Sequence, residues 1–203
     1  RRASASRQAV VGLTDASPIV RAVATKAILS MPTEESVAAL LPLVSDKDEF
    51  VRREVAYSLG LTHNRKATEP LTDLLLNDKE DGVRAAAAVA LGDIGDENAV
   101  VALANILSPG SSAAIKTKKI EKNVFVLRAA AKSLGQMRSK AGVPALIAAL
   151  ANEKYVDDVR REAASALGQI GDPAAVPALR SAANSEDPYL SHVAYESLRK
   201  IAP

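Results

Sequence analysis

Apolar and small residues recur along this chain with the spacing of an α-helix, and the helical pattern itself repeats. From Val83, such residues occupy positions i, i+4, i+7, i+8 and i+11, which share one face of a helix. Aligned on position i+8, the copies are anchored by Ile28, Leu59, Leu91, Leu134, Leu167 and Leu198. The anchors lie 31 to 33 residues apart, except for 43 residues between Leu91 and Leu134. A fixed period of this length predicts a solenoid of stacked repeats.

A second apolar period follows the anchors and predicts the partner helix of a helix pair. One example is the set Val100, Leu103 and Leu107. Between the two helices, Gly95 and Gly171 stand where the left-handed residue that ends a helix is expected. One helix pair cannot bury its apolar face alone, whereas stacked pairs bury a continuous core. The pattern therefore predicts an all-α fold of stacked antiparallel helix pairs.

The most complete copy of the motif is VRREAASALGQIGDPAAVPAL, from Val159 to Leu179. The copy from Val83 to Leu103 matches it, except that Val101 stands where Pro is usual. This motif resembles HEAT repeats of the short bacterial kind, often called bilin-lyase-like HEAT repeats, and the resemblance extends over nearly the whole chain. It implies a right-handed α-solenoid.

We expect residues 1–203 to form a single solenoid. Its units are predicted as a partial unit at 1–16, full units at 17–47, 48–79, 80–123, 124–155 and 156–186, and a capping helix at 187–203. The long third unit contains an insertion at 108–123, where Pro109 and Gly110 indicate a loop. Because the chain begins with Arg1 rather than Met, we expect either a removed leader or a fragment of a longer repeat array.

Composition narrows the function classes. The chain has no Cys, which excludes disulfides, thiol chemistry and zinc or iron–sulfur sites built on Cys. The net charge of +2 is too balanced to argue by itself for nucleic acid or membrane binding. No apolar run reaches the ~18 residues of a membrane span. The compartment is left open, with the cytoplasm favoured slightly over secretion or the periplasm.

Catalytic motifs are missing from the sequence. It contains no G-x-S-x-G, P-loop, Rossmann fingerprint or H-E-x-x-H. HEAT-like deoxyhypusine hydroxylases bind iron through repeated His-Glu pairs, but here Asn64 follows His63 and Val193 follows His192. We therefore expect surface or turn histidines, no metal or cofactor site, and a protein that is not an enzyme.

An arginine follows the first apolar residue of four first helices. The series consists of Arg21, Arg52, Arg84 and Arg160, and Leu127 interrupts it after the insertion. One interpretation is a ladder that binds phosphate or carboxylate groups of a partner. The other, which we favour, is a structural bridge to an acidic residue near a helix start, such as Asp15, Asp48 or Asp81.

Partner binding is the function that we expect. In HEAT-like proteins the second helices line the concave surface where partners bind, which here implies Ala38, Pro42, Glu69, Asp73, Val101, Asn105, Pro144, Ala148, Pro177 and Ser181. Of these, Glu69, Asp73, Val101 and Asn105 are our candidate contacts. A second group of candidates lies in the insertion, whose lysines favour an acidic partner: Lys116, Lys118, Lys119 and Lys122.

We thus expect a non-enzymatic scaffold or adaptor that binds another protein, whose identity and stoichiometry stay open. The family resemblance leaves one alternative, a bilin lyase or isomerase-like chaperone. The lysines and the arginine series leave another, binding to a nucleic-acid backbone, which is the less favoured.

Overall fold

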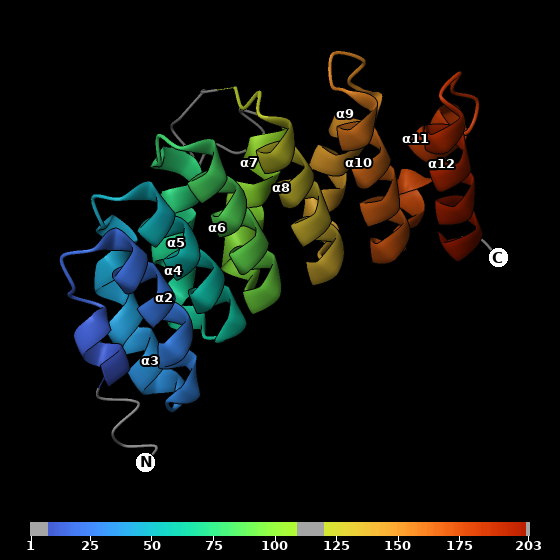
Figure 1. The fold of residues 1–203 in the computed structure, drawn as a ribbon. Coiled ribbons are helices and arrows are strands. Elements are labelled where there is room, and N and C mark those ends of the chain that lie inside the picture. Colours follow the sequence, from blue (N-terminus) through green and yellow to red (C-terminus); the bar gives the residue numbers. More distant parts are fainter. Residues whose placement is uncertain (1–7, 109–119, 202–203) are drawn as a thin grey trace. The chain divides into compact units, whose positions relative to one another are not determined.

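The computed structural model describes residues 8–108 and 120–201, which contain helices and no strand (Figure 1). The α-helices are α2 (Pro18–Ala27), α3 (Thr33–Leu40), α4 (Glu49–Leu61), α5 (Thr68–Asn77), α6 (Asp81–Ile94), α7 (Val100–Leu107), α8 (Val124–Met137), α9 (Val143–Ala151), α10 (Asp157–Ile170), α11 (Val176–Ala182) and α12 (Pro188–Ile201). Within these described ranges, none of the helices is long and apolar enough to cross a membrane.

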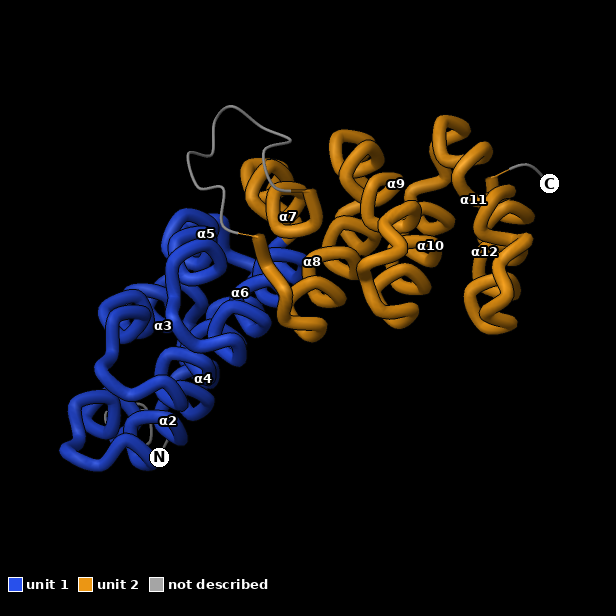
Figure 2. Tube along the Cα trace, turned by 90° about the horizontal axis from the view of Figure 1, so that it is seen from above, with its two compact units in different colours: residues 1–94 blue, residues 95–203 orange. Residues whose placement is uncertain are grey.

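The chain forms two compact units, residues 1–94 and residues 95–203, which we call the N-terminal and C-terminal units (Figure 2). In the N-terminal unit, α4 packs between α2 and α6, and α5 packs against α6. In the C-terminal unit, α10 packs between α8 and α12, while α9 covers α10 and α11 covers α12. Each unit is a stack of helix pairs, which confirms the predicted all-α solenoid class. The division into repeat units stays a prediction.

The predicted anchors form the centre of each layer. The first five anchors, from Ile28 to Leu167, have no exposed surface, whereas Leu198 in the last helix is half-buried. A glycine follows four of the anchors, and at Gly60, Gly135 and Gly168 it lets the next first helix approach closely. A Cβ atom on Gly60 would lie 2.8 Å from the Cα of Ala90. Because no side chain fits such a gap, the Leu-Gly pair sets the spacing between neighbouring first helices.

The turn inside each helix pair uses the same backbone conformation with different residues. Gly95 and Gly171 have φ values of 68° and 75°, as the sequence predicts. His63 and Arg138, at the same distance after their anchors, adopt it with φ values of 51° and 52°. An Asn or Asp then caps the short 3-10 helix that leads into three of the second helices; these residues are Asn64, Asp96 and Asp172.

Candidate partner-binding site

The arginine series holds together the turns that connect successive helix pairs. Arg21 on α2 donates two hydrogen bonds to the carboxylate of Asp46, Nε to Oδ2 at 2.7 Å and Nη2 to Oδ1 at 2.8 Å. Its Nη1 also donates to the backbone carbonyl of Asp15 at 2.9 Å. Arg52 on α4 binds Asp78 in the same way, at 2.6 and 2.9 Å. We call these two arrangements the arginine clamps.

The other two arginines also bind groups of the fold. Arg84 donates to the carboxylate of Asp81 and, at 3.0 Å, to the backbone carbonyl of Asp78. Arg160 donates from Nε to the backbone carbonyl of Leu150 at 3.1 Å. All four guanidinium groups therefore bind within the chain, which supports the structural interpretation of the series.

Two of the expected acidic partners were wrong. Arg21 pairs with Asp46 rather than Asp15, which supplies only its backbone carbonyl. Asp48 caps α4 by accepting from the N–H groups of Phe50 and Val51, and the partner of Arg52 is Asp78. The physical reason is that an Asp just after a second helix lies in the turn to the next helix pair. From there its carboxylate reaches the arginine on the first helix of its own pair. Asp81 is a partner of Arg84, as expected.

The clamps hold both aspartates in the charged form. The hydrogen bonds from Arg21 lower the pKa of Asp46. Burial would raise the pKa of Asp78, but the Arg52 hydrogen bonds, the Glu80 backbone N–H and the nearby guanidinium charges together hold it below its usual value. The side chain of Asp78 is only 5% exposed, so this charge depends on its partner.

In each unit, most of the second-helix residues that the family resemblance implied are exposed. We use the name second-helix face for these exposed residues within each unit: Ala38, Pro42, Glu69 and Asp73 in the N-terminal unit, and Val101, Pro144, Ala148, Pro177 and Ser181 in the C-terminal unit. Asn105 is the exception and was predicted wrongly. It is 2% exposed, because α7 packs against both α8 and α9.

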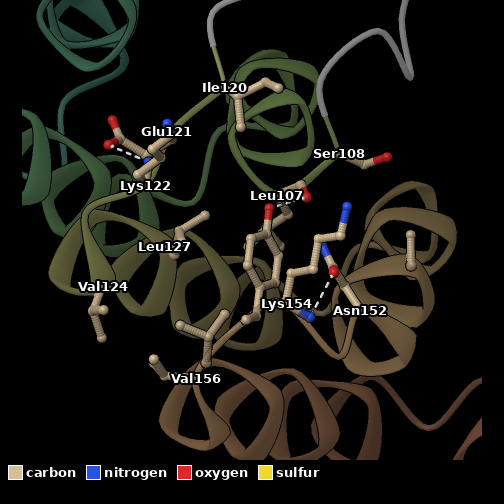
Figure 3. A pocket seen from close by; sticks show the side chains of 13 residues that line it. Leu107, Ser108, Ile120, Glu121, Lys122, Val124, Leu127, Asn152, Lys154 and Val156 are labelled. Atoms are coloured by element: carbon tan, nitrogen blue, oxygen red, sulfur yellow. Dashed lines mark hydrogen bonds between the residues drawn. The ribbon is translucent and has the colours of Figure 1, made fainter.

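Of the four candidate lysines, Lys116, Lys118 and Lys119 lie outside the described residues. Lys122 is described and exposed, just before α8. It lies at the edge of a pocket in the C-terminal unit, with a volume of about 1060 Å³. Figure 3 shows this space between Val124, Leu127 and Val156 on one side and Asn152 and Lys154 on the other.

The pocket lies at the position where the arginine series is interrupted. Leu127 stands in the arginine position, is 2% exposed and lines the pocket together with Leu107 and Val159. Instead of a clamp, one hydrogen bond ties the turn after α9 to the end of α7, from the Tyr155 hydroxyl to the carbonyl of Leu107 at 2.9 Å. We call this space the Leu127 pocket.

The positive and negative side chains around the Leu127 pocket differ in their exposure. Lys122 and Lys154 are exposed at its rim, and neither forms an ion pair with a described residue. Glu121 is 7% exposed, and its carboxylate accepts hydrogen bonds from the backbone N–H groups of Lys122 and Asn123 at 2.9 Å. Burial raises the pKa of Tyr155, and the charge of Glu121 raises it further. The pocket thus combines an apolar interior with a cationic rim.

Sequence reasoning did not find this pocket. Two signals for it were present: the leucine at an arginine position, and the 33-residue spacing between Leu134 and Leu167, the longest outside the insertion. The longer spacing accommodates the turn that carries Tyr155. Both signals are departures from the repeat, and they can be recognised only by comparison with the regular repeats.

The two histidines are exposed, as expected, and belong to different units. His63 Nδ1 lies 2.7 Å from the carbonyl oxygen of Asp93 in the N-terminal unit, whereas His192 is on α12. Residues 8–108 and 120–201 contain no group of three or more His, Asp or Glu side chains that fits a metal ion.

Comparison with known proteins places this geometry among helical repeats. The family model for HEAT repeats matches residues 8–92, 58–118 and 121–199. A stretch of 71 residues is 37% identical to deoxyhypusine hydroxylase-B from Oryza sativa subsp. japonica, covering 34% of this chain and 24% of that protein. This match overturns the expectation that the chain is not an enzyme, because the named relative is a hydroxylase.

Two solved structures extend the comparison. The complex of CpcE and CpcF of phycocyanin lyase from Nostoc sp. PCC7120 is 26% identical, with a TM-score of 0.67, and the match covers 97% of this chain and 76% of that chain. Human deoxyhypusine hydroxylase in complex with glycerol is 20% identical, with a TM-score of 0.48, and the match covers 98% and 96% of the two chains.

Proposed function

Because the chain belongs to the family of HEAT repeats, we propose that it binds another protein through its second-helix face. The observation that carries this proposal is the composition of that face, which apart from Glu69 and Asp73 consists of Ala, Pro, Val and Ser. Fixing an Ala or Pro side chain costs almost no rotamer entropy, whereas a Lys or Arg loses about 1.5–2 kcal/mol. Covering such a surface with a partner therefore costs little side-chain conformational entropy.

The exposed row of a first helix differs in this respect. On α8, the exposed positions Arg128, Lys132 and Gln136 follow each other at helical spacing. These long side chains would lose more entropy on burial and would have to give up their hydration. The contrast favours the second helices as the binding side, and Glu69 and Asp73 add a local negative charge that favours a cationic group of the partner.

The similarity to the CpcE–CpcF complex supports a protein partner, because that relative is a protein assembled with a second protein. The same relative favours a second candidate function, a lyase-like role on a bilin-bearing protein. Absorbance spectra of a bilin with and without the purified chain test this candidate: a shifted and intensified visible band is expected, and unchanged spectra would exclude bilin binding.

Affinity purification with quantitative mass spectrometry tests the proposed function. The bait is compared with a Val101→Arg/Pro177→Arg double variant and with Gln136→Arg as the matched control on α8. All three positions are exposed, so each variant is expected to fold. We expect the double variant to lose proteins that the wild type and the control retain. Equal capture by all three would contradict binding through the second-helix face.

A further inference from the structure

We propose that the Leu127 pocket receives a bulky apolar side chain of the partner protein, and that acidic residues flank this side chain. The inference rests on the proposed function, because it names the chemistry of the segment that binds beside the second-helix face. Three observations carry it: the apolar interior, the cationic rim and the continuity between pocket and face.

The interior fits an apolar anchor. Leu107, Leu127 and Val159 line the pocket and are at most 2% exposed, so its inner wall is apolar. The volume of about 1060 Å³ lies at the upper end of the range found for ligand sites, so it accommodates a large aromatic or aliphatic side chain with part of its backbone. Buried apolar anchors of this kind dominate the binding energy of protein interfaces.

The rim selects carboxylates. Lys122 and Lys154 line the pocket and are exposed, and neither forms an ion pair with a described residue. The carboxylate of Glu121 also lines the pocket, where it accepts from the backbone N–H groups of Lys122 and Asn123, so two lysines stand against one carboxylate in the lining. An acidic residue beside the anchor would accelerate association and disfavour basic competitors.

The pocket is continuous with the second-helix face, which favours a protein segment over a free small molecule. Ala148 on α9 belongs to both, since it is an exposed residue of the face and also lines the pocket. A partner that covers Pro144 and Ala148 therefore reaches the pocket without crossing another element. A second pocket, of about 570 Å³, lies beside Arg160 and includes Ser181 of the face, but most of its lining residues are polar or charged.

Selection from a phage-displayed library of random peptides on the immobilised chain tests the proposal. We expect enrichment of a Trp, Phe or Leu residue with Asp or Glu at neighbouring positions. One enriched peptide is then synthesised with a fluorophore, and its affinity is measured by anisotropy. Lys154→Glu should weaken binding by about tenfold through charge reversal, and Ala148→Arg should abolish binding by filling the entrance. Gln136→Arg should bind like the wild type.

Both pocket variants change exposed residues, so thermal unfolding is expected to match the wild type and serves as the folding control. A second readout uses the absence of Cys: Ser108→Cys, at the pocket wall, carries a unique environment-sensitive dye that should respond to the peptide. No apolar–acidic enrichment, or peptide binding unchanged in Ala148→Arg and Lys154→Glu, would overturn the proposal. Binding of dodecanoate at the dye without any enriched peptide would overturn it in favour of a small amphipathic anion.

Failure here differs from failure of the proposed function. If the Val101→Arg/Pro177→Arg double variant loses captured proteins while both pocket variants retain them, the face binds a partner and the pocket does not. If the double variant and the pocket variants all capture the wild-type set, both proposals are wrong.

Discussion

The N-terminal and C-terminal units hold the turns between successive helix pairs with partly different interactions. In the N-terminal unit, Arg21 and Arg52 fill the space beside the connecting turns and bind Asp46 and Asp78 there. In the C-terminal unit, Arg161 binds Asp187 at 2.8 Å, but Leu127 occupies the arginine position of α8, where the Tyr155 hydroxyl donates to the carbonyl of Leu107. Where leucine replaces the arginine, an apolar pocket lies beside the turn, whereas the pocket beside Arg160 has a mainly polar and charged lining.

The largest expected effect comes from breaking a clamp. Arg52→Leu should lower the free energy of unfolding by about 3–5 kcal/mol, because it leaves the buried carboxylate of Asp78 without its partner. Arg53→Leu, at the adjacent position, whose side chain is 41% exposed, should cost less than about 1 kcal/mol. Urea unfolding measures both. Similar losses from the two variants would show that the clamp contributes no more than a surface charge.

Truncating a side chain that lines the pocket should lower the free energy of unfolding by less than truncating a side chain in the core. Leu134→Ala, in a fully buried anchor of α8, should cost about 3–4 kcal/mol, since it leaves a closed cavity. Leu127→Ala on the same helix should cost about 2 kcal/mol, because the space it leaves joins the adjoining pocket instead of forming a closed cavity. Chemical unfolding of the two variants compares them, and a larger loss for Leu127→Ala would mean that the pocket is closed in solution.

Acid should weaken the clamps selectively. The pKa values of Asp46 and Asp78 are lowered in the folded chain. Their contribution is therefore complete above the unfolded value of about 3.9 and is lost as the pH falls through the folded value. The stability difference between wild type and Arg52→Leu should shrink when the pH is lowered from 7 to below 4. A constant difference across this range would refute the ionic origin of the clamp.

The smallest effect is expected at the substitute for the clamp. Tyr155→Phe removes the hydrogen bond to the carbonyl of Leu107 and should cost about 0.5–1.5 kcal/mol. Thermal unfolding measures the loss, with Tyr195→Phe on the exposed side of α12 as the neutral control. A Tyr155→Phe loss as large as that of Arg52→Leu would mean that the C-terminal unit is closed as firmly as the clamps close the N-terminal unit.

Periodicity predicted the helices, the anchors and the left-handed glycines, because each of these is set by residues close together in the sequence. The aspartate partners in the arginine clamps were not predicted, because Asp46 lies 25 residues after Arg21 and no local sequence pattern indicates the pairing. Asn105 was misplaced because its burial depends on how α7 packs against two other helices. The Leu127 pocket was not predicted, because it lies where the sequence departs from the repeat, whereas the sequence analysis relied on positions that match the repeat.

The expectation that the chain is not an enzyme failed for a different reason. The absence of the usual catalytic motifs describes single stretches of sequence, whereas a repeat scaffold can carry chemistry on side chains drawn from several repeats. The hydroxylase match covers only a third of the chain, so it corrects the exclusion without assigning a reaction.

Partner capture by Ala148→Arg tests the central claim most directly, because Ala148 lies on both the second-helix face and the wall of the Leu127 pocket. The variant is compared with wild type and Gln136→Arg by affinity purification with quantitative mass spectrometry, under conditions where all three show the same thermal unfolding. Our account predicts that Ala148→Arg alone loses the proteins captured by the wild type. Full retention of those proteins by Ala148→Arg would contradict it.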